Sequence, residues 1–491
     1  MHDCQALRFP LLLSVETQFV RGELNMPLRS CLAVLIATCS AGTALASPLS
    51  NMTMARQAQQ ALERAASPEA PGVAVLIAQG DTVIFRGARG RAEIELGVPL
   101  SADHVFRIAS VTKMFTAATI LKLAELGKLS LDDSLAKYLP DFPNATGITL
   151  RELLSHTAGI SDITKDPTPG FTRRDADTAT LIAEIRKRPP SFAPGTGWAY
   201  SNAGFILLGA VIEKVTGEPW YDALQKQLLQ PLGLKHTTYG GNALLIPGRT
   251  AGYTTDSSTH QVSNAKFISM TVPAAAGALV STVDDLRLWM RALADGRAIG
   301  KQGLQQMTTP APDLPGTPSA YRYGLGMYIW HIRGNTMVGH TGQIDGFAAV
   351  VAYLPKQDIT VIALANDDNF DARSMGRRLA AIALGEPFPE VVAVPASDET
   401  LQALEGTYRI DENTIETLSV KDHTLYAQRG NKNVIPLQMT AGQQLHFIPD
   451  ELSYFVPVRD TDGKIIRLDY FADGDGPAQA LPRILKNSTA P

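Results

Sequence analysis

The sequence predicts an α+β fold in which one antiparallel sheet is flanked by helices, with an inserted mostly helical region and a small C-terminal all-β domain. Strand-like runs occur at residues 73–86 and again at 323–365, which brings strands from both ends of the main domain into one sheet. Helical patterns fill residues 128–310 between them. Beyond residue 400, short β-rich runs recur about every ten residues, which favours a small barrel or sandwich.

In chain order, residues 52–66 are predicted to form an amphipathic helix, and Gly80-Asp81 joins two strands in a hairpin. A broadly apolar, mostly buried helix begins near Ser110 and is closed by Gly127, since glycine is common after the last helical turn. The later elements are a helix at Asp284–Leu293, strands around 323–332, 346–353 and 359–365, and a helix around 371–384.

A proline-rich linker around residues 387–395 separates the last of these helices from the β-rich runs. Those runs are Ile415–Val420, Thr424–Gln428, Gln444–Ile448, Tyr454–Arg459 and Lys464–Phe471. They contain no catalytic cluster, so we interpret this part as a structural or substrate-shaping module. The predicted organisation is a leader over residues 1–46, a main domain over 47–390, and a linker with the β domain over 391–491.

The leader is typical of a signal peptide. Arg29 precedes a short apolar run, Cys31–Thr38, and Ala44-Leu45-Ala46 provides an A-x-A cleavage site. Met26 fits the start of such a signal, because signals lie at the very N-terminus. We therefore expect a periplasmic or secreted protein with no integral membrane segment after cleavage, since the apolar run is too short for a good membrane span.

All three cysteines (Cys4, Cys31 and Cys39) lie within this leader, so the mature protein would hold no disulfide. Export to a periplasm does not require one. A lipid anchor on Cys39 is an alternative that we disfavour, because Thr38 is larger than the residue that usually precedes such a site.

Length and composition limit the kinds of partner and cofactor to expect. A chain of 491 residues can bury a large core and should hold more than one domain. The net charge of −4 is small and mixed, which argues against nucleic acid or an anionic membrane as a partner. The nine histidines show no H-x-H or H-E-x-x-H spacing, so we expect no metal and no other cofactor.

Ser110-Val111-Thr112-Lys113 carries the clearest chemical signal. Residues three apart on a helix share one face, so the two polar side chains would meet. A serine becomes a useful nucleophile when a neighbour takes its proton, and burial lowers the pKa of a lysine enough for that. A second S-x-x-K, Ser134 to Lys137, lies in a short amphipathic piece ended by Pro140, where we expect the lysine to face water.

Two further motifs lie downstream. Tyr200-Ser201-Asn202, the only Tyr-x-Asn in the chain, lies in a loop before an apolar helix, where side chains can converge on a cleft. The alternative is a tyrosine packed under the loop and an asparagine that caps the helix. His340-Thr341-Gly342 lies between two strand-like segments, and its glycine would let the backbone approach a ligand. Its alternative is a turn with a hydrogen-bonded histidine.

Together these motifs resemble those of the serine β-lactamase and penicillin-binding protein superfamily. The resemblance is to the class C β-lactamase and DD-carboxypeptidase branch, with its esterase relatives, which has Tyr-x-Asn where other branches have Ser-x-Asn. Leu153–Ile160 and Tyr200–Gly217 also resemble that branch, and the likeness covers residues 55 to 385. It implies the same α+β core, and a small-molecule or short-peptide substrate.

The resemblance also implies roles. Ser110 would be the nucleophile, Lys113 and Tyr200 would share the role of general base, and Asn202 would orient Lys113 and the substrate amide. His340 stands where class C β-lactamases have lysine and some DD-carboxypeptidases have histidine.

Thr341 and Gly342 complete the third motif beside the substrate. The oxyanion hole would be formed by the backbone N–H groups of Ser110 and Gln343, and two such donors stabilise the tetrahedral intermediate strongly. The function that follows is an exported serine hydrolase that cleaves esters or amides of small substrates through an acyl-enzyme on Ser110.

One departure bears on the substrate. DD-carboxypeptidases with this third motif hold a carboxylate partly with an arginine shortly after a Tyr-Gly-x-Gly strand, whereas here Tyr323–Met327 is followed by Tyr328, Ile329 and Trp330. The aromatic residues favour an apolar acyl group. The alternatives are a D-alanyl-D-alanine carboxypeptidase or D-aminopeptidase, a class C-like β-lactamase, and a catalytically silent binding protein of the same fold.

Overall fold

The computed structural model describes residues 48–165, 167–256, 259–318, 320–448 and 452–484. The predicted leader, with Met26, Cys39 and the cleavage site before Ser47, lies outside these residues. Within the described part of the chain, no helix is both long enough and apolar enough to cross a membrane.

The main sheet contains strands from both ends of the main domain, as predicted. Its strands are paired antiparallel in the order β10-β11-β12-β13-β14-β1-β2, and β14 pairs with β1 so that Val73 lies opposite Ala365. The bounds are β1 (Val73–Gln79), β2 (Thr82–Arg89), β10 (Arg322–Tyr323), β11 (Tyr328–Ile332), β12 (Asn335–Ile344), β13 (Phe347–Leu354) and β14 (Ile359–Ala365). The α+β fold class and the hairpin at residues 80–81 are therefore confirmed.

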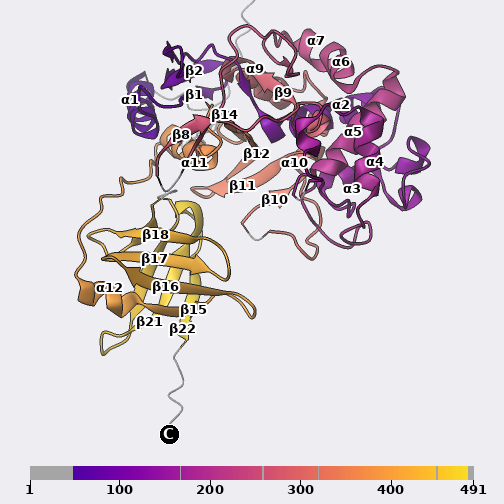
Figure 1. Ribbon diagram of the computed structural model, residues 1–491. Coiled ribbons are helices and arrows are strands. Elements are labelled where there is room, and N and C mark those ends of the chain that lie inside the picture. The colour runs from indigo at the N-terminus through magenta and orange to yellow at the C-terminus, as the bar shows by residue number, and fades with distance from the viewer. Residues whose placement is uncertain (1–47, 166, 257–258, 319, 449–451, 485–491) are drawn as a thin grey trace, which may run out of the picture. The chain divides into compact units, whose positions relative to one another are not determined.

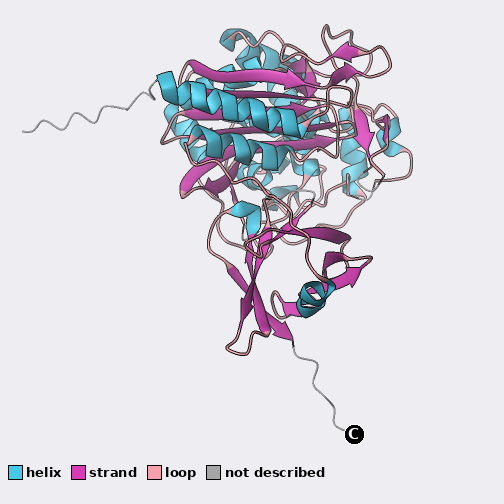
Figure 2. Ribbon diagram, turned by 90° about the vertical axis from the view of Figure 1, so that its left-hand side faces the viewer, coloured by secondary structure: helices cyan, strands magenta, loops and turns pink. Residues whose placement is uncertain are grey.

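Helices cover both faces of this sheet, which is why β13 and β14 are buried along their whole length. On one face, α1 (Pro48–Ala65) and α11 (Ala372–Ala383) lie side by side, as Figure 2 shows. On the other face lies the helical region, with α2 (Thr112–Glu125) at its centre (Figure 1). The ring of Phe115 on α2 stacks on that of Trp289 at 4.1 Å.

The remaining elements of the main domain lie around this core. The helices are α3 (Leu150–Ser155), α4 (Thr178–Arg186), α5 (Asn202–Thr216), α6 (Trp220–Leu224), α7 (Gln230–Leu232), α8 (Ala274–Gly277), α9 (Val283–Ala294) and α10 (Lys301–Thr308). The short strands are β3 (Arg91–Glu93), β4 (Val98–Pro99), β5 (Phe106–Arg107), β6 (Thr238–Tyr239), β7 (Tyr253–Thr255), β8 (Val262–Asn264) and β9 (Leu279–Ser281).

The C-terminal part forms a closed antiparallel barrel after a short helix, α12 (Asp398–Leu404) (Figure 1). Its strands are β15 (Gly406–Arg409), β16 (Ile415–Lys421), β17 (Thr424–Arg429), β18 (Val434–Met439), β19 (Leu445–Phe447), β20 (Tyr454–Arg459), β21 (Ile465–Phe471) and β22 (Gln479–Ile484). The sequence patterns identified five of them and missed β15, β18 and β22, which are short or interrupted by polar residues and proline. The division between 47–390 and 391–491 stays a prediction.

Two segments near the third motif differ from expectation. The strand predicted over 323–332 is two strands separated by a turn, in which Gly326 has a φ of +73° and lies against the backbone of Lys113. Residues 335–344, where a turn was weighed, form the long strand β12, because β11 and β13 both pair with it. The third motif is thereby held in the sheet.

Candidate active site

Ser110 and Lys113 meet as the sequence predicts. Ser110 lies in a 3₁₀ turn, Ala109–Val111, that leads directly into α2, and Lys113 in the first turn of α2 is fully buried. Its Nζ lies 3.0 Å from Ser110 Oγ, 2.7 Å from Asn202 Oδ1 and 2.8 Å from the carbonyl oxygen of Ala276.

Burial lowers the pKa of Lys113 to about 7, and the carboxylate of Asp162 opposes part of this shift. A neutral amine has two N–H donors and one lone pair. Asn202 Oδ1 and the Ala276 carbonyl can only accept hydrogen bonds, so they take both donors. The lone pair of Nζ is then left for the Ser110 hydroxyl. The arrangement thus presents a serine O–H to a buried base.

The second motif lies beside this pair. Tyr200 makes a hydrogen bond with Ser110, and its ring centroid lies 4.9 Å from Lys113 Nζ. Loss of hydration raises the pKa of Tyr200 well above its usual value, so the side chain is a neutral phenol at ordinary pH. Ser201, not Asn202, caps α5 by accepting from the Gly204 N–H, and this leaves the Asn202 amide to face Lys113.

The third motif places a neutral histidine in the site. His340 on β12 is buried, and burial together with the charge of Lys113 lowers its pKa to about 3. Its Nδ1 lies 2.5 Å from the carbonyl oxygen of Thr341, so Nδ1–H donates there and Nε2, 3.0 Å away, accepts from the Tyr323 hydroxyl. His340 therefore contributes no positive charge, unlike a lysine at this position.

The strand carrying His340 packs tightly on the turn that carries the serine. A Cβ on Gly342 would lie 2.2 Å from the carbonyl oxygen of Ile108 and 3.1 Å from Ala109 Cβ, so glycine is required for this approach. Ala109 itself has a φ of 45°, in the left-handed region that residues other than glycine rarely adopt. Both features fix the backbone directly before Ser110.

These residues line one cleft of about 550 Å³. The sequence-predicted residues on its wall are Ser110, Tyr200, Asn202, His340, Thr341, Gly342 and Gln343, while Lys113 lies beneath. Tyr328 also lines the cleft, whereas Trp330 lies behind it, buried and stacked on Tyr328 at 5.2 Å.

Arg373, in the first turn of α11, is a charged residue on the cleft wall that was not predicted from the sequence. Its guanidinium pairs with Asp473 of the barrel at 2.5 Å. The two arginines nearest the Tyr-Gly-x-Gly strand lie elsewhere: Arg322 pairs with Asp313, and Arg333 pairs with Asp475. The sequence did place a basic residue at the start of the predicted helix 371–384. Its position at the cleft depends on the packing of α11 on the sheet, which the sequence pattern does not show.

The second S-x-x-K forms no such pair. Ser134 caps a short 3₁₀ turn and donates to the carbonyl oxygen of Ala145, and Lys137 is exposed and paired with Asp133. The expectation that Lys137 faces water is confirmed.

Comparison with known proteins shows the family to which this chain belongs. The β-lactamase family model matches residues 56–384, which is most of the chain. The chain belongs to the β-lactamase family. It is 31% identical to Protein flp of Staphylococcus aureus (strain MW2) over 303 residues, covering 60% of this chain and 59% of that protein. It is 36% identical to Esterase EstB of Burkholderia gladioli over 180 residues, covering 33% of this chain and 46% of that protein.

The chain is also similar to solved structures. A D-stereospecific amidohydrolase from Streptomyces sp. is 30% identical with a TM-score of 0.58, covering 68% of this chain and 98% of that one. The octameric penicillin-binding protein homologue from Pyrococcus abyssi is 22% identical with a TM-score of 0.61, covering 87% and 99%. The latter likeness shows the fold alone, and it extends over more of the chain than the family model does.

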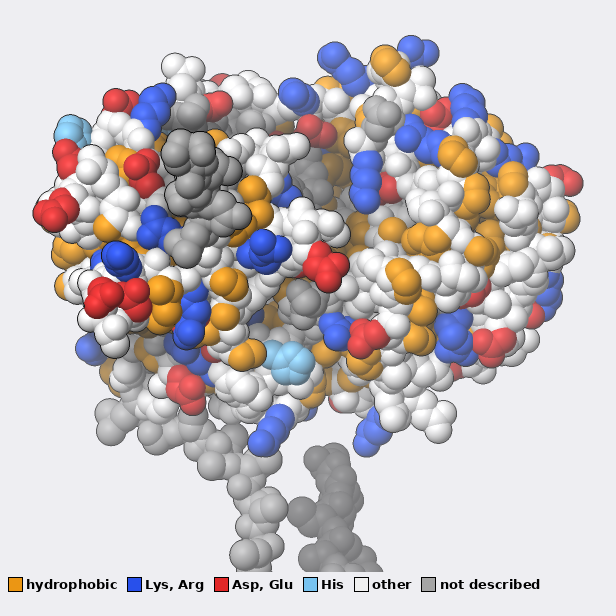
Figure 3. Space-filling model, turned by 90° about the horizontal axis from the view of Figure 1, so that it is seen from below, with side chains coloured by type: hydrophobic (Ala, Val, Ile, Leu, Met, Phe, Trp, Pro, Cys, Tyr) orange, Lys and Arg blue, Asp and Glu red, His pale blue; other side chains and the backbone are white. Residues whose placement is uncertain are grey.

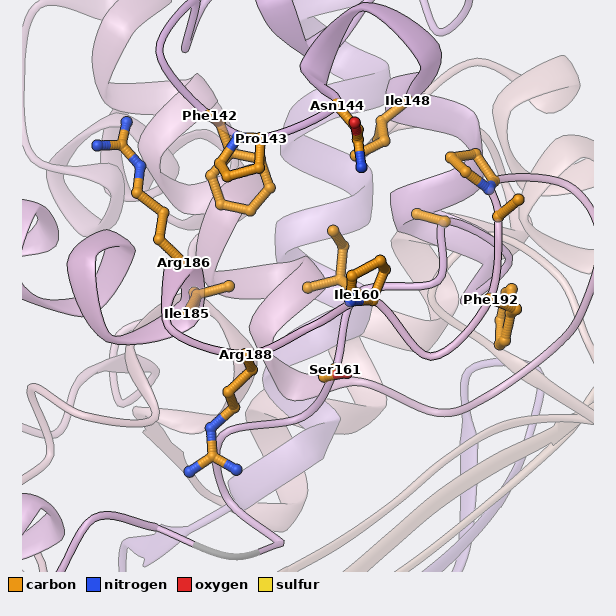
Figure 4. Close-up of a pocket in the computed structure, with 14 residues that line it drawn as sticks. Phe142, Pro143, Asn144, Ile148, Ile160, Ser161, Ile185, Arg186, Arg188 and Phe192 are labelled. Atoms are coloured by element: carbon orange, nitrogen blue, oxygen red, sulfur yellow. The ribbon is translucent and has the colours of Figure 1, made fainter.

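Outside the motifs of the β-lactamase family, a second pocket of about 370 Å³ lies in the helical region. Its wall is largely apolar, with Ile160 directed into it and Arg186 and Arg188 at its margin (Figure 4). On the face shown in Figure 3, basic and acidic side chains are interspersed, in keeping with the mixed net charge. Among the described residues, no group of three or more His, Cys, Asp or Glu is placed to hold a metal ion.

Proposed function

We propose that this chain is a serine hydrolase that forms an acyl-enzyme on Ser110. The observation that carries the proposal is the buried Lys113, whose Nζ lies 3.0 Å from Ser110 Oγ and whose two donors have other acceptors. A base with a pKa of about 7 takes a proton efficiently at neutral pH.

In the proposed reaction, Ser110 Oγ attacks the substrate carbonyl as its proton passes to Lys113 Nζ. The proton then leaves with the alcohol or amine of the substrate. Tyr200 is a neutral phenol bonded to Ser110, so it serves as a relay between Lys113 and the leaving group and not as a free tyrosinate. Water then attacks the ester, and the same groups work in reverse.

We assign the oxyanion hole to the backbone N–H groups of Ser110 and Gln343. The close packing of Gly342 on the Ile108–Ala109 backbone supports this assignment, because it brings β12 beside the serine turn. Donors fixed in advance need no reorganisation as charge develops on the substrate oxygen, and each contributes about 3 kcal/mol of barrier lowering.

For substrate, we propose small esters or amides. Tyr328 offers apolar area to an acyl group or alcohol, and an esterase and an amidohydrolase are among the relatives. Arg373 favours a second candidate, a D-amino-acid peptide or β-lactam that carries a carboxylate, but its pairing with Asp473 means that such a group must compete for the guanidinium.

We expect kcat/KM to be higher for p-nitrophenyl butyrate than for nitrocefin or a D-Ala-D-Ala peptide, with penicillin forming a slowly cleared adduct. Steady-state kinetics on the three substrates and the intact protein mass after each exposure provide the measurements. A clear preference for the D-Ala-D-Ala peptide would instead favour the carboxypeptidase alternative. No adduct with any substrate would favour the silent binding protein.

We also propose export to the periplasm through the leader, on the basis of the Ala44-Leu45-Ala46 pattern. The protein recovered from a periplasmic fraction should begin near Ser47. N-terminal sequencing checks this, and recovery of a chain that retains residues 1–25 would contradict both cleavage and the Met26 start.

A further inference from the structure

A short loop outside the three motifs holds the Asn202 amide. Asn202 Nδ2 lies 3.1 Å from Asp162 Oδ2 and 2.8 Å from Thr164 Oγ1, so both of its N–H groups have acceptors. The Thr164 hydroxyl donates to Asp162 Oδ1 at 2.9 Å, as does the Thr164 backbone N–H at the same distance. The Thr164 oxygen must therefore act as an acceptor toward Asn202.

The loop that carries Asp162 is itself fixed. Ser161 Oγ donates to the carbonyl oxygen of Pro189 at 2.5 Å, and the Ser191 N–H donates to Gly159 at 2.8 Å. Ile163 on the other side of Asp162 is buried in the core, and Ile160 lines the pocket of Figure 4. The carboxylate is thus held in place from both directions.

An asparagine amide can fit its space in either of two orientations. In the observed one, Oδ1 accepts from Lys113 and leaves the lysine lone pair to Ser110. If the amide were reversed, Nδ2 would donate to that lone pair, and the base would be engaged before it could take the Ser110 proton.

We propose that Asp162, with Thr164, is a positioning residue that locks the orientation of the Asn202 amide and so keeps the Lys113 lone pair available to Ser110. This inference rests on the proposed function for its catalytic consequence. Asp162 touches neither the reacting atoms nor the wall of the cleft, and it acts through Asn202.

Asp162→Asn is the sharpest test, because it keeps the size of the side chain and replaces an acceptor with a donor. The Thr164 backbone N–H can only donate, so it favours the amide oxygen at the Oδ1 position and leaves the new NH₂ group facing Asn202 Nδ2. Two donors then meet, and reversal of the Asn202 amide is favoured. We expect the rate of Ser110 labelling by a fluorophosphonate to fall about 10²-fold, the size of effect that misplacement of a reacting group produces. Thr164→Val, which removes one neutral acceptor, should cost about fivefold.

The titration of Lys113 responds both to the charge of Asp162 and to the orientation of the Asn202 amide, so a variant that changes no charge is needed to separate the two effects. The groups that face Lys113 are Asp162, Tyr200, His156 and His340, and Asp162 is the anion among them. Loss of that anion disfavours the ammonium, so the acid limb of the labelling rate should move to lower pH in Asp162→Asn. Asp141→Asn, at an exposed aspartate, is the matched control and should change neither rate nor limb.

A spectroscopic readout separates this inference from the proposed function. In protein labelled with [6-¹³C]lysine, the Lys113 resonance, assigned by its loss in Lys113→Arg, should titrate at lower pH in Thr164→Val than in the wild type. Thr164→Val removes an acceptor of the Asn202 amide and no charge, and a reversed amide would donate to the neutral amine and stabilise it. This holds whether or not Ser110 reacts. If the wild type fails to label, the proposed function is wrong while the titration still tests the lock.

A double-mutant cycle with Asn202→Ala completes the test. The Asn202 amide is absent in that background, so Asp162→Asn should reduce the labelling rate almost no further. Equal losses in both backgrounds, or an unchanged Lys113 titration, would overturn the inference. If Asp162→Asn fails to fold, Thr164→Val at an exposed position carries the same comparison, and a loss that persists without Asn202 would likewise overturn it.

Discussion

Ser110→Ala is expected to abolish turnover while the protein stays folded. Ser110 Oγ lies 3.0 Å from the base Lys113 Nζ, so loss of this oxygen removes the covalent route, and kcat should fall about 10⁴- to 10⁶-fold. Only one half-buried oxygen is removed, so the free energy of unfolding should change by less than about 1 kcal/mol. Kinetics and denaturant unfolding on the same preparation measure both quantities.

Ser134→Ala is the matched control, because it alters the other S-x-x-K at the same spacing. Ser134 caps a short 3₁₀ turn, so its loss should cost about 1 kcal/mol of stability and no activity. Wild-type rates in folded Ser110→Ala protein would end the assignment of the nucleophile.

Lys113→Arg is expected to be nearly as damaging as Lys113→Ala. A guanidinium cannot give up its proton in a protein, so the base is lost although the positive charge is kept. Loss of a general base costs about 10²- to 10⁴-fold in rate. Labelling of Ser110 by a fluorophosphonate measures this without assuming a substrate, and Lys113→Met, a neutral side chain of similar length, controls for burial of the arginine charge. If Lys113→Arg retained most of the wild-type activity, Lys113 could not be the general base.

The pH profile of the wild type follows from the same residue. The reactive form is the neutral amine, so kcat/KM should rise with pH and reach half its plateau at about pH 7, the pKa of buried Lys113. His340, with a pKa of about 3, and His156, whose pKa burial also lowers, are neutral across this range and cannot produce the limb. The contribution of Lys113 to stability has the same sign: the unfolded chain binds more protons between pH 7 and about 10.4, so stability rises with pH there.

Local patterns predicted much of the fold and the site. The Ser110–Lys113 pairing depends only on three-residue spacing at a helix start, and the burial of Lys113 follows from the apolar residues around it on α2. The second and third motifs were identified from their places before an apolar helix and between two strands, and the resemblance implied their roles. The structure brings them into one cleft with Ser110.

The features that were missed depend on packing between distant segments. Residues 335–344 contain two glycines and lack an alternating pattern, and they form a strand because neighbouring strands pair with them on both sides. Arg373 reaches the cleft only because α11 packs on the sheet, and Asp162 reaches Asn202 only because its loop is anchored 40 residues upstream of it. The cap of α5 is a local feature that the sequence nevertheless left undecided, because Ser201 and Asn202 are adjacent and serine and asparagine are equally good caps.

The left-handed backbone at Ala109 sets stability against activity. A glycine would adopt a φ of 45° without steric cost, whereas an alanine there costs about 1 kcal/mol of folding free energy. The native state carries that cost at the residue before Ser110, where the methyl group also meets Gly342. Selection for thermal stability alone would therefore relax this turn, and a thermostable variant obtained that way would hold its serine less firmly. The turn at Ala109 is thus a position at which tolerance to heat and speed of reaction are expected to diverge.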